Sequence, residues 1–197
     1  MNLPIPEGAV LLQGFAAGAA DDLMAGVEAV IQQAPFRHMT VPGGHKMSVA
    51  MSNCGQTGWV SDGNGYRYEA RDPQTGLPWP PMPQGFLALA RDAATRAGYP
   101  DFTPDACLIN CYAPGARMSL HQDRDERDFT APIVSVSMGA TATFLFGGLR
   151  RGDKPRRIKL GHGDVVVWGG PARLAFHGIA PLKQGDTRYN LTFRKAL

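Results

Sequence analysis

The stretch ACLINCYAPGARMSLHQD, residues 106–123, shows how the second half of the chain is built. Two short runs rich in strand-forming residues flank an Ala-Pro-Gly turn. The same alternation of short strand and turn continues toward the C-terminus. We expect strands at 106–112, 118–121, 133–137, 142–146, 157–160, 164–168, 174–177 and 187–194. Many short strands joined by tight turns favour a double-sheet jelly roll.

Upstream of residue 106, the spacing of apolar residues changes to that of helices. Residues 21–34 and 83–97 each carry an apolar stripe; the first ends before Pro35, and the second begins at Pro83 and ends at Gly98. Residues 53–84, rich in Gly, Pro and aromatic side chains, are expected to form a long irregular excursion. The predicted fold class is α+β, mainly β, with a double-stranded β-helix (jelly-roll) core buttressed by N-terminal helices.

Length and composition agree with one domain. The chain has 197 residues and an ordinary share of apolar and charged side chains, so we expect a single domain over 1–197. About 1–105 would be an N-terminal extension with helices and the irregular excursion, and about 106–197 the jelly-roll core. A net charge of +3 permits polyanion binding without demonstrating it.

Targeting signals and cysteine spacing indicate which class of protein this is and where it is located. Apolar runs stay well below the roughly 20 residues that span a bilayer, and the N-terminus lacks a charged region followed by an apolar one. Three cysteines without a CxxC pair argue against a disulfide framework and a zinc finger. We therefore expect a cytoplasmic monomer with no membrane partner.

A metal site is indicated by His121 and Asp123. Because side chains alternate along a strand, these two can face one metal while Gln122 turns away. An HxD triplet alone is a weak signal, and His177 is the best third ligand among the remaining histidines. Two imidazoles and one carboxylate form the ligand set of non-haem Fe(II) oxygenases.

The segment 187–194 alternates in an unusual way. One face carries four polar side chains: Arg188, Asn190, Thr192 and Arg194. From this strand alone, a solvent-facing orientation is the simpler interpretation. The strand 106–112, however, also places an amide and a phenol, Asn110 and Tyr112, on one face. Guanidinium forks with neutral donors suit a small dicarboxylate, and this inventory matches 2-oxoglutarate.

Together these residues resemble the AlkB family of Fe(II)- and 2-oxoglutarate-dependent dioxygenases. The resemblance rests on Asn110-x-Tyr112-x-Pro114-Gly115, His121-x-Asp123-x-Asp125, His177, Arg188-Tyr189-Asn190-Leu191-Thr192-Phe193-Arg194, Gly147-Gly148-Leu149, Asp72-Pro73-Gln74-Thr75-Gly76 and the run from Gly163 to Gly170. It covers most of residues 50–197.

The resemblance implies roles for individual residues. Iron would be held by His121, Asp123 and His177. The co-substrate 2-oxoglutarate would be held by Asn110, Tyr112, Arg188, Asn190 and Arg194, with Arg188 on its distal C5 carboxylate and Arg194 near the metal-bound C1 end. O2 would be the second co-substrate.

For the substrate, the resemblance implies a nucleotide-recognition lid over residues 53–71. Trp59 and Tyr66 match its aromatic and phosphate-contacting positions, Asp125 its base-edge acceptor, and Arg151 a further substrate contact. The plainer alternatives are that the two aromatic residues anchor the lid to the core and that Asp125 is a surface charge.

The implied function is oxidative demethylation of N-alkylated bases such as 1-methyladenine and 3-methylcytosine. It couples 2-oxoglutarate decarboxylation to methyl hydroxylation and releases formaldehyde. The expected partner is alkylated single-stranded DNA, with RNA as a second candidate. One alternative is an Fe(II)/2-oxoglutarate oxygenase acting on a protein or small molecule. Another is a non-catalytic nucleic-acid-binding β-barrel module, which would not need the metal ligands and inward arginines; a zinc hydrolase would leave those arginines unexplained.

Overall fold

The computed structural model describes residues 5–183 and 185–197. A large sheet contains β1 (Ala9–Leu12), β2 (Arg37–Thr40), β3 (Lys46–Gly55), β6 (Ala106–Tyr112), β8 (Ile133–Gly139), β11 (Val165–Trp168) and β13 (Arg188–Arg194). A small sheet contains β7 (Met118–His121), β9 (Ala142–Phe146), β10 (Arg156–Leu160) and β12 (His177–Ile179). A separate hairpin pairs β4 (Gly58–Asp62) with β5 (Gly65–Glu69).

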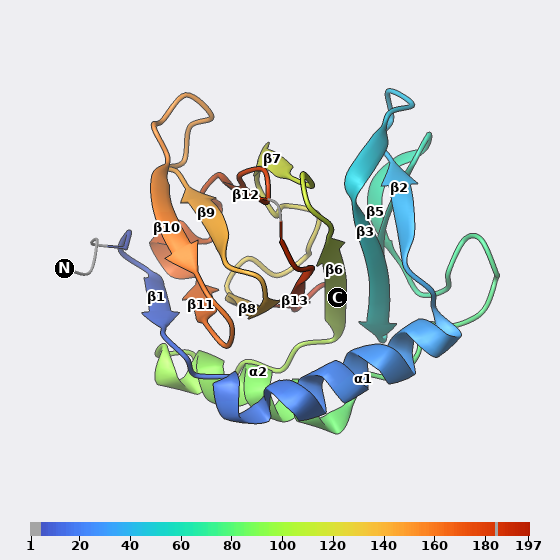
Figure 1. Cartoon of the computed structure of the whole chain (residues 1–197), viewed down its shortest axis with the longest axis horizontal. Coiled ribbons are helices and arrows are strands. Elements are labelled where there is room, and N and C mark those ends of the chain that lie inside the picture. Colours follow the sequence, from blue (N-terminus) through green and yellow to red (C-terminus); the bar gives the residue numbers. More distant parts are fainter. Residues whose placement is uncertain (1–4, 184) are drawn as a thin grey trace.

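The two larger sheets form the predicted jelly roll. Their orders are β1-β11-β8-β13-β6-β3-β2 and β10-β9-β12-β7, so the chain crosses repeatedly between sheets from β6 onward. Both helices, α1 (Ala20–Gln33) and α2 (Gln84–Arg96), lie side by side along the base of the sheets in Figure 1. The fold class and both helices are therefore confirmed, each helix to within one residue at either end.

Two expectations about local structure were wrong. The strand expected at 174–177 is instead β12, which begins at His177 after a short 3-10 helix, Gly170–Ala172. The stretch 53–84 is not irregular throughout, because it contains the end of β3 and the β4–β5 hairpin. Glycines near the hairpin concealed its strand pattern, since glycine weakens a strand signal without preventing a hairpin.

Apolar side chains fill two layers on either side of the large sheet. One cluster joins both helices to the outward side chains of the sheet, including Val134, Leu191 and Phe193. The other lies between the two sheets and includes Phe144 and Trp168. Within the described part of the chain, no helix combines the length and the apolar character needed to cross a membrane.

The polar face of β13 points into the space between the sheets, as its strand partners require. Arg188, Asn190, Thr192 and Arg194 are all at least nine-tenths buried. In the antiparallel register, Asn190 lies opposite Asn110 on β6 and opposite Ser137 on β8. The solvent-facing interpretation of this strand is therefore wrong, and the polar residues of three neighbouring strands form one buried surface.

Gly178 controls how closely β12 approaches β7. A Cβ atom at this position would lie 2.6 Å from the carbonyl oxygen of Met118 and 3.0 Å from that of Ser119. Both contacts are with backbone, so they can be relieved only by separating the strands. Since His121 and His177 are direct partners across this pair, the glycine also sets the spacing of the two imidazoles.

We therefore expect Gly178→Ala to lower the free energy of unfolding of the metal-free protein by about 1–3 kcal/mol, as overpacking does elsewhere. Chemical denaturation monitored by tryptophan fluorescence would measure it. Gly152→Ala is the control, because a Cβ atom there meets nothing within 4 Å. If the two variants had the same free energy of unfolding, β7 and β12 would be able to separate without cost.

Candidate metal and co-substrate site

The three predicted metal ligands come together between the sheets. His121 ends β7, Asp123 follows two residues later, and His177 begins β12. One ligand atom from each lies within 4.8 Å of the others. Gln122 turns away and donates its amide to the carbonyl of Leu174 at 2.7 Å. Asp123 lies beyond the strand rather than on it, but the predicted convergence on one point is found.

Hydrogen bonds orient both imidazoles toward that point. Nδ1 of His121 lies 2.9 Å from the carbonyl oxygen of Ser119, and Nδ1 of His177 lies 3.0 Å from that of Ala175. A carbonyl only accepts, so each Nδ1 carries the proton and each Nε2 is left with a lone pair for a metal. Burial, assisted by the neighbouring His121, lowers the pKa of His177 to about 4, which keeps the ring neutral.

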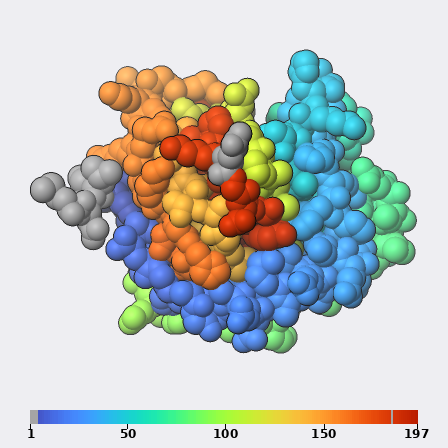
Figure 2. Space-filling view, viewed as in Figure 1, coloured from blue at the N-terminus to red at the C-terminus, as the bar shows by residue number. Residues whose placement is uncertain are grey.

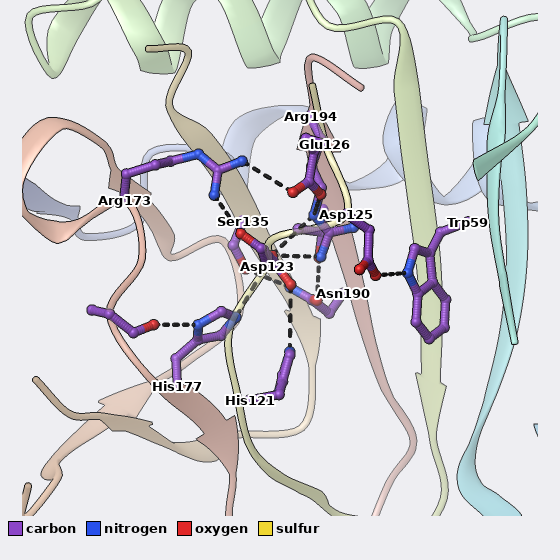
Figure 3. Close-up of polar contacts among 12 residues, drawn as sticks. Trp59, His121, Asp123, Asp125, Glu126, Ser135, Arg173, His177, Asn190 and Arg194 are labelled. Atoms are coloured by element: carbon purple, nitrogen blue, oxygen red, sulfur yellow. Dashed lines mark hydrogen bonds and ion pairs between the residues drawn. The ribbon is translucent and has the colours of Figure 1, made fainter. Parts of the chain in front are cut away.

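Asp123 is held by a buried guanidinium. Arg194 donates from Nη2 at 2.7 Å and from Nε at 3.0 Å to Oδ2 of Asp123 (Figure 3). Burial by itself raises the pKa of the Asp123 carboxyl, but the Arg194 guanidinium outweighs it and leaves the pKa well below its ordinary value. The donor set is therefore two imidazole nitrogens and one ionised carboxylate, which fits Fe(II).

Glu126 supports this ion pair from behind. Its carboxylate lies 3.3 Å from Nε of Arg194 and 3.2 Å from Nη2 of Arg173, and it accepts the hydroxyl of Tyr68 at 2.7 Å. Arg173 in turn donates to the backbone carbonyl of Asp123 at 2.7 Å. Figure 3 shows Arg173 and Arg194 converging on Glu126. Two arginines thus fix both the side chain and the backbone of Asp123.

Arg188, near the other end of β13, is in the opposite situation. It is 1% exposed, and its Nη2 donates to the hydroxyl of Ser137 at 2.9 Å. Its Nε and Nη1 have no hydrogen-bond partner among the described residues. The ring of Tyr112 lies 5.0 Å from the guanidinium carbon. Because a buried cation without an anion is costly, this geometry fits a carboxylate of 2-oxoglutarate.

Amides line the space between the two arginines. Asn190 donates to the hydroxyl of Ser135 at 2.8 Å and to the carbonyl of Val136 at 2.9 Å. The side-chain oxygen of Asn110 is buried without a partner in the described structure. One cavity of about 820 Å³ is lined by Asn110, Ser135, Asn190 and the three predicted metal ligands. The predicted co-substrate residues are therefore brought together, with polar atoms still available.

At the mouth of the cavity lie the four residues expected to contact substrate. Trp59 and Tyr66 stack on each other with ring centroids 5.7 Å apart. Trp59 also donates its indole N–H to Asp125 at 2.8 Å, as Figure 3 shows. Arg151, from the loop between β9 and β10, lies over the ring of Phe176. All four line the same cavity as the metal ligands.

Sequence reasoning missed several residues of this site. Ser135 and Ser137 alternate on β8 and share a face, a signal of the same kind as the one read on β13. Glu126 stands beside the HxD motif and could have been noticed as a further acidic residue. Arg173 has no comparable local signal, because only the fold brings it to Glu126 and Asp123.

Comparison with known proteins identifies the family. The profile of the 2OG-Fe(II) oxygenase superfamily matches residues 8–194. The chain is 59% identical to alpha-ketoglutarate-dependent dioxygenase AlkB of Escherichia coli (strain K12), over 98% of this chain and 92% of that protein. The chain belongs to the AlkB family.

Other relatives agree with this membership. The AlkB homolog of Caulobacter vibrioides (strain NA1000 / CB15N) is 49% identical over 86% of this chain and 80% of its own length. The solved structure of OsALKBH1 superposes with a TM-score of 0.84 at 29% identity, covering 98% of this chain and 99% of that one. The protein is thus an Fe(II)- and 2-oxoglutarate-dependent dioxygenase, with 2-oxoglutarate and O2 as co-substrates. A more distant relative from Mus musculus, 31% identical over 61% of this chain and 31% of its own length, is named nucleic acid dioxygenase ALKBH1.

In this AlkB-family chain, we expect Glu126→Gln to lower the free energy of unfolding by about 3 kcal/mol. The substitution removes the negative charge that Glu126 places beside the buried guanidinium groups of Arg173 and Arg194. Removing one partner of a buried ion pair is costly. Denaturant unfolding of the metal-free protein would measure the loss. Glu28→Gln, at an exposed position on α1, is the matched control and should change little. A Glu126→Gln protein as stable as this control would show that Asp123 alone balances the arginines.

Proposed function

We propose that the protein repairs N-alkylated bases, with 1-methyladenine and 3-methylcytosine in single-stranded DNA as its main substrates and RNA as a further one. The observation that carries this proposal is one cavity containing three different features. It holds a His-Asp-His cluster, a buried guanidinium with two nitrogens that lack a partner among the described residues, and a pair of aromatic rings at the entrance. These are the requirements for binding a metal, a dicarboxylate and an unstacked base.

The residues divide this work between them. His121, Asp123 and His177 would hold Fe(II), which when bound supplies the chemistry that couples oxidative decarboxylation of 2-oxoglutarate to hydroxylation of an N-methyl group. Tyr112 and Arg188 would bind the distal carboxylate, and the side-chain oxygen and nitrogen atoms of Asn110 and Asn190 lie along the remainder of the ligand's path. Arg194, which is bound to Asp123, would keep the ligand oriented. The packed sheets would keep the pocket dry.

The substrate end of the cavity depends on the β4–β5 hairpin. A base must leave its helix before a group on it can be oxidised, and stacking on an aromatic side chain is worth roughly 1–3 kcal/mol. Trp59 and Tyr66 offer such a surface. Because Trp59 already donates to Asp125, an incoming base edge would compete with the indole for that carboxylate. The lid would therefore rearrange as substrate enters.

The proposal includes a monomer acting on one strand at a time. Metal ligands, co-substrate residues and aromatic rings all come from this one chain, so the cavity needs no residue from a second copy. A strand without a partner presents its bases without the cost of breaking pairs. The β4–β5 hairpin and the β9–β10 loop supply the residues proposed to receive it.

The central test is formaldehyde release from a single-stranded oligonucleotide carrying 3-methylcytosine, with Fe(II), 2-oxoglutarate and ascorbate. We expect turnover by the native protein and a loss of at least about 100-fold in His121→Ala, which removes a metal ligand. His38→Ala changes an exposed histidine on β2 and should retain activity.

Undiminished release by His121→Ala would overturn the metal assignment. Succinate formation that no alkylated nucleic acid stimulates would instead point to a protein or small-molecule substrate. No succinate under any condition would point to a binding module without catalysis.

Charge at the cavity mouth predicts selectivity. Bases methylated at N1 of adenine or N3 of cytosine are cationic, so the Asp125 carboxylate should favour them over neutral lesions. We expect Asp125→Asn to reduce kcat/KM for 3-methylcytosine by roughly tenfold more than for neutral 3-methylthymine, a difference of about 1.4 kcal/mol. The amide can still accept the indole hydrogen bond of Trp59. An equal loss for both bases would show that Asp125 acts by shape rather than by charge.

A further inference from the structure

The basic residues of this chain are concentrated in one short segment. Residues 150–159 contain six of its 20 Lys and Arg but only one of its 17 Asp and Glu. The rest of the chain therefore carries 14 basic and 16 acidic residues and is slightly negative. The whole positive balance of the protein resides in the tip of the β9–β10 hairpin and strand β10.

These six side chains are exposed: Arg150, Arg151, Lys154, Arg156, Arg157 and Lys159. Among the residues that the structure describes, none of them forms an ion pair within 4.0 Å, although Lys and Arg elsewhere form seven such pairs. The one acidic residue of the segment, Asp153, accepts the backbone N–H of Arg150 at 3.1 Å and closes the turn. Like charges gathered without counter-charges repel one another, which a bound polyanion would relieve.

The position of the hairpin connects this charge to the cavity. In Figure 2 it forms a projecting lobe on one side of a notch, and the β2–β3 turn forms the lobe on the other side. Arg151 lines the cavity from the first lobe, and His45 and Lys46 line it from the second. Further along β10, Arg157 and Lys159 alternate with the buried Ile158 and therefore point outward from the small sheet.

We propose that Lys154, Arg157 and Lys159 form a second nucleic-acid contact, a backbone track that binds the phosphates flanking the alkylated nucleotide. The proposal rests on the function proposed above and extends it beyond the cavity. Arg151 reaches the nucleotide at the mouth, and the track continues from there over the outer side of β10. Contacts of this kind position a strand without reading its sequence.

An anionic membrane would also be attracted to positive charge, but this surface lacks apolar anchors. Peripheral membrane segments combine cations with large apolar or aromatic side chains. In the described structure, Leu149 is the single large apolar side chain of the hairpin with high exposure. β10 is moreover an edge strand, so its cations form a narrow row, which suits a strand of phosphates better than a lipid surface.

The test is the salt dependence of binding. A double variant on β10, Arg157→Gln with Lys159→Gln, would be compared with a double variant on α2, Arg91→Gln with Arg96→Gln, which removes the same charge from exposed positions. Binding of the holoenzyme to a labelled single strand of about 20 nucleotides would be followed from about 50 to 200 mM salt. In a plot of log affinity against log salt concentration, each phosphate contact with a single strand contributes a slope of about −0.7. The β10 variant lacks two contacts, so the fall in its affinity between about 50 and 200 mM salt should be about sevenfold smaller than that of the native protein. The α2 variant should show the native slope.

Catalysis separates this proposal from the function on which it rests. With a methylated trinucleotide, which cannot extend along β10, both double variants should turn over at the native rate. With the longer strand, the β10 variant alone should show a raised KM. A β10 variant with the native salt slope and native KM would overturn the track. The track would also be overturned if the β10 variant lost binding to anionic vesicles but bound the strand as tightly as the native protein does.

The two proposals can also fail separately. If neither the native protein nor the variants demethylate the oligonucleotide, the proposed repair activity is overturned. A reduced salt slope in the β10 variant would still support the backbone track.

Discussion

The site depends on burying two arginines inside a β-sandwich. Arg188 and Arg194 lie on the inward face of β13, where an aliphatic side chain would be the ordinary choice and where a charge without a partner is costly. The fold meets this cost differently at each end of the strand. Arg194 is neutralised permanently by Asp123 and Glu126, whereas Arg188 keeps two nitrogens, Nε and Nη1, without a partner among the described residues. One arginine therefore stabilises the carboxylate of a predicted metal ligand, and the other is available to a ligand.

This division explains why the strand register matters more than any single residue. A slip of one position would turn the polar face of β13 toward the helices and its apolar face into the cavity. The register is fixed on both sides, by β6 and by β8, and the outward residues Leu191 and Phe193 pack into the helix layer. Hydrophobic packing on one face of the sheet thus determines where the charges on the other face lie.

Much of this could be predicted from the sequence, because alternation along a strand is a local property. The polar faces of β6 and β13 and the His121 and Asp123 pair were all visible in this way, and most strand bounds followed. Contacts between distant segments were not. Nothing near Arg173 indicates that it holds the carbonyl of Asp123, and the glycines around β4 and β5 hid a hairpin whose strands pair mainly with each other.

That hairpin connects the proposed substrate entrance to the predicted metal ligands through two hydrogen bonds. Trp59 donates to Asp125, and Tyr68 donates to Glu126. Both acceptors lie within three residues of Asp123, on the short segment whose conformation sets the carboxylate. Because the bond to Asp125 is exposed and the bond to Glu126 belongs to a buried ion-pair network, the first can open while the second holds. The hairpin can therefore release Trp59 toward a base without disturbing Asp123.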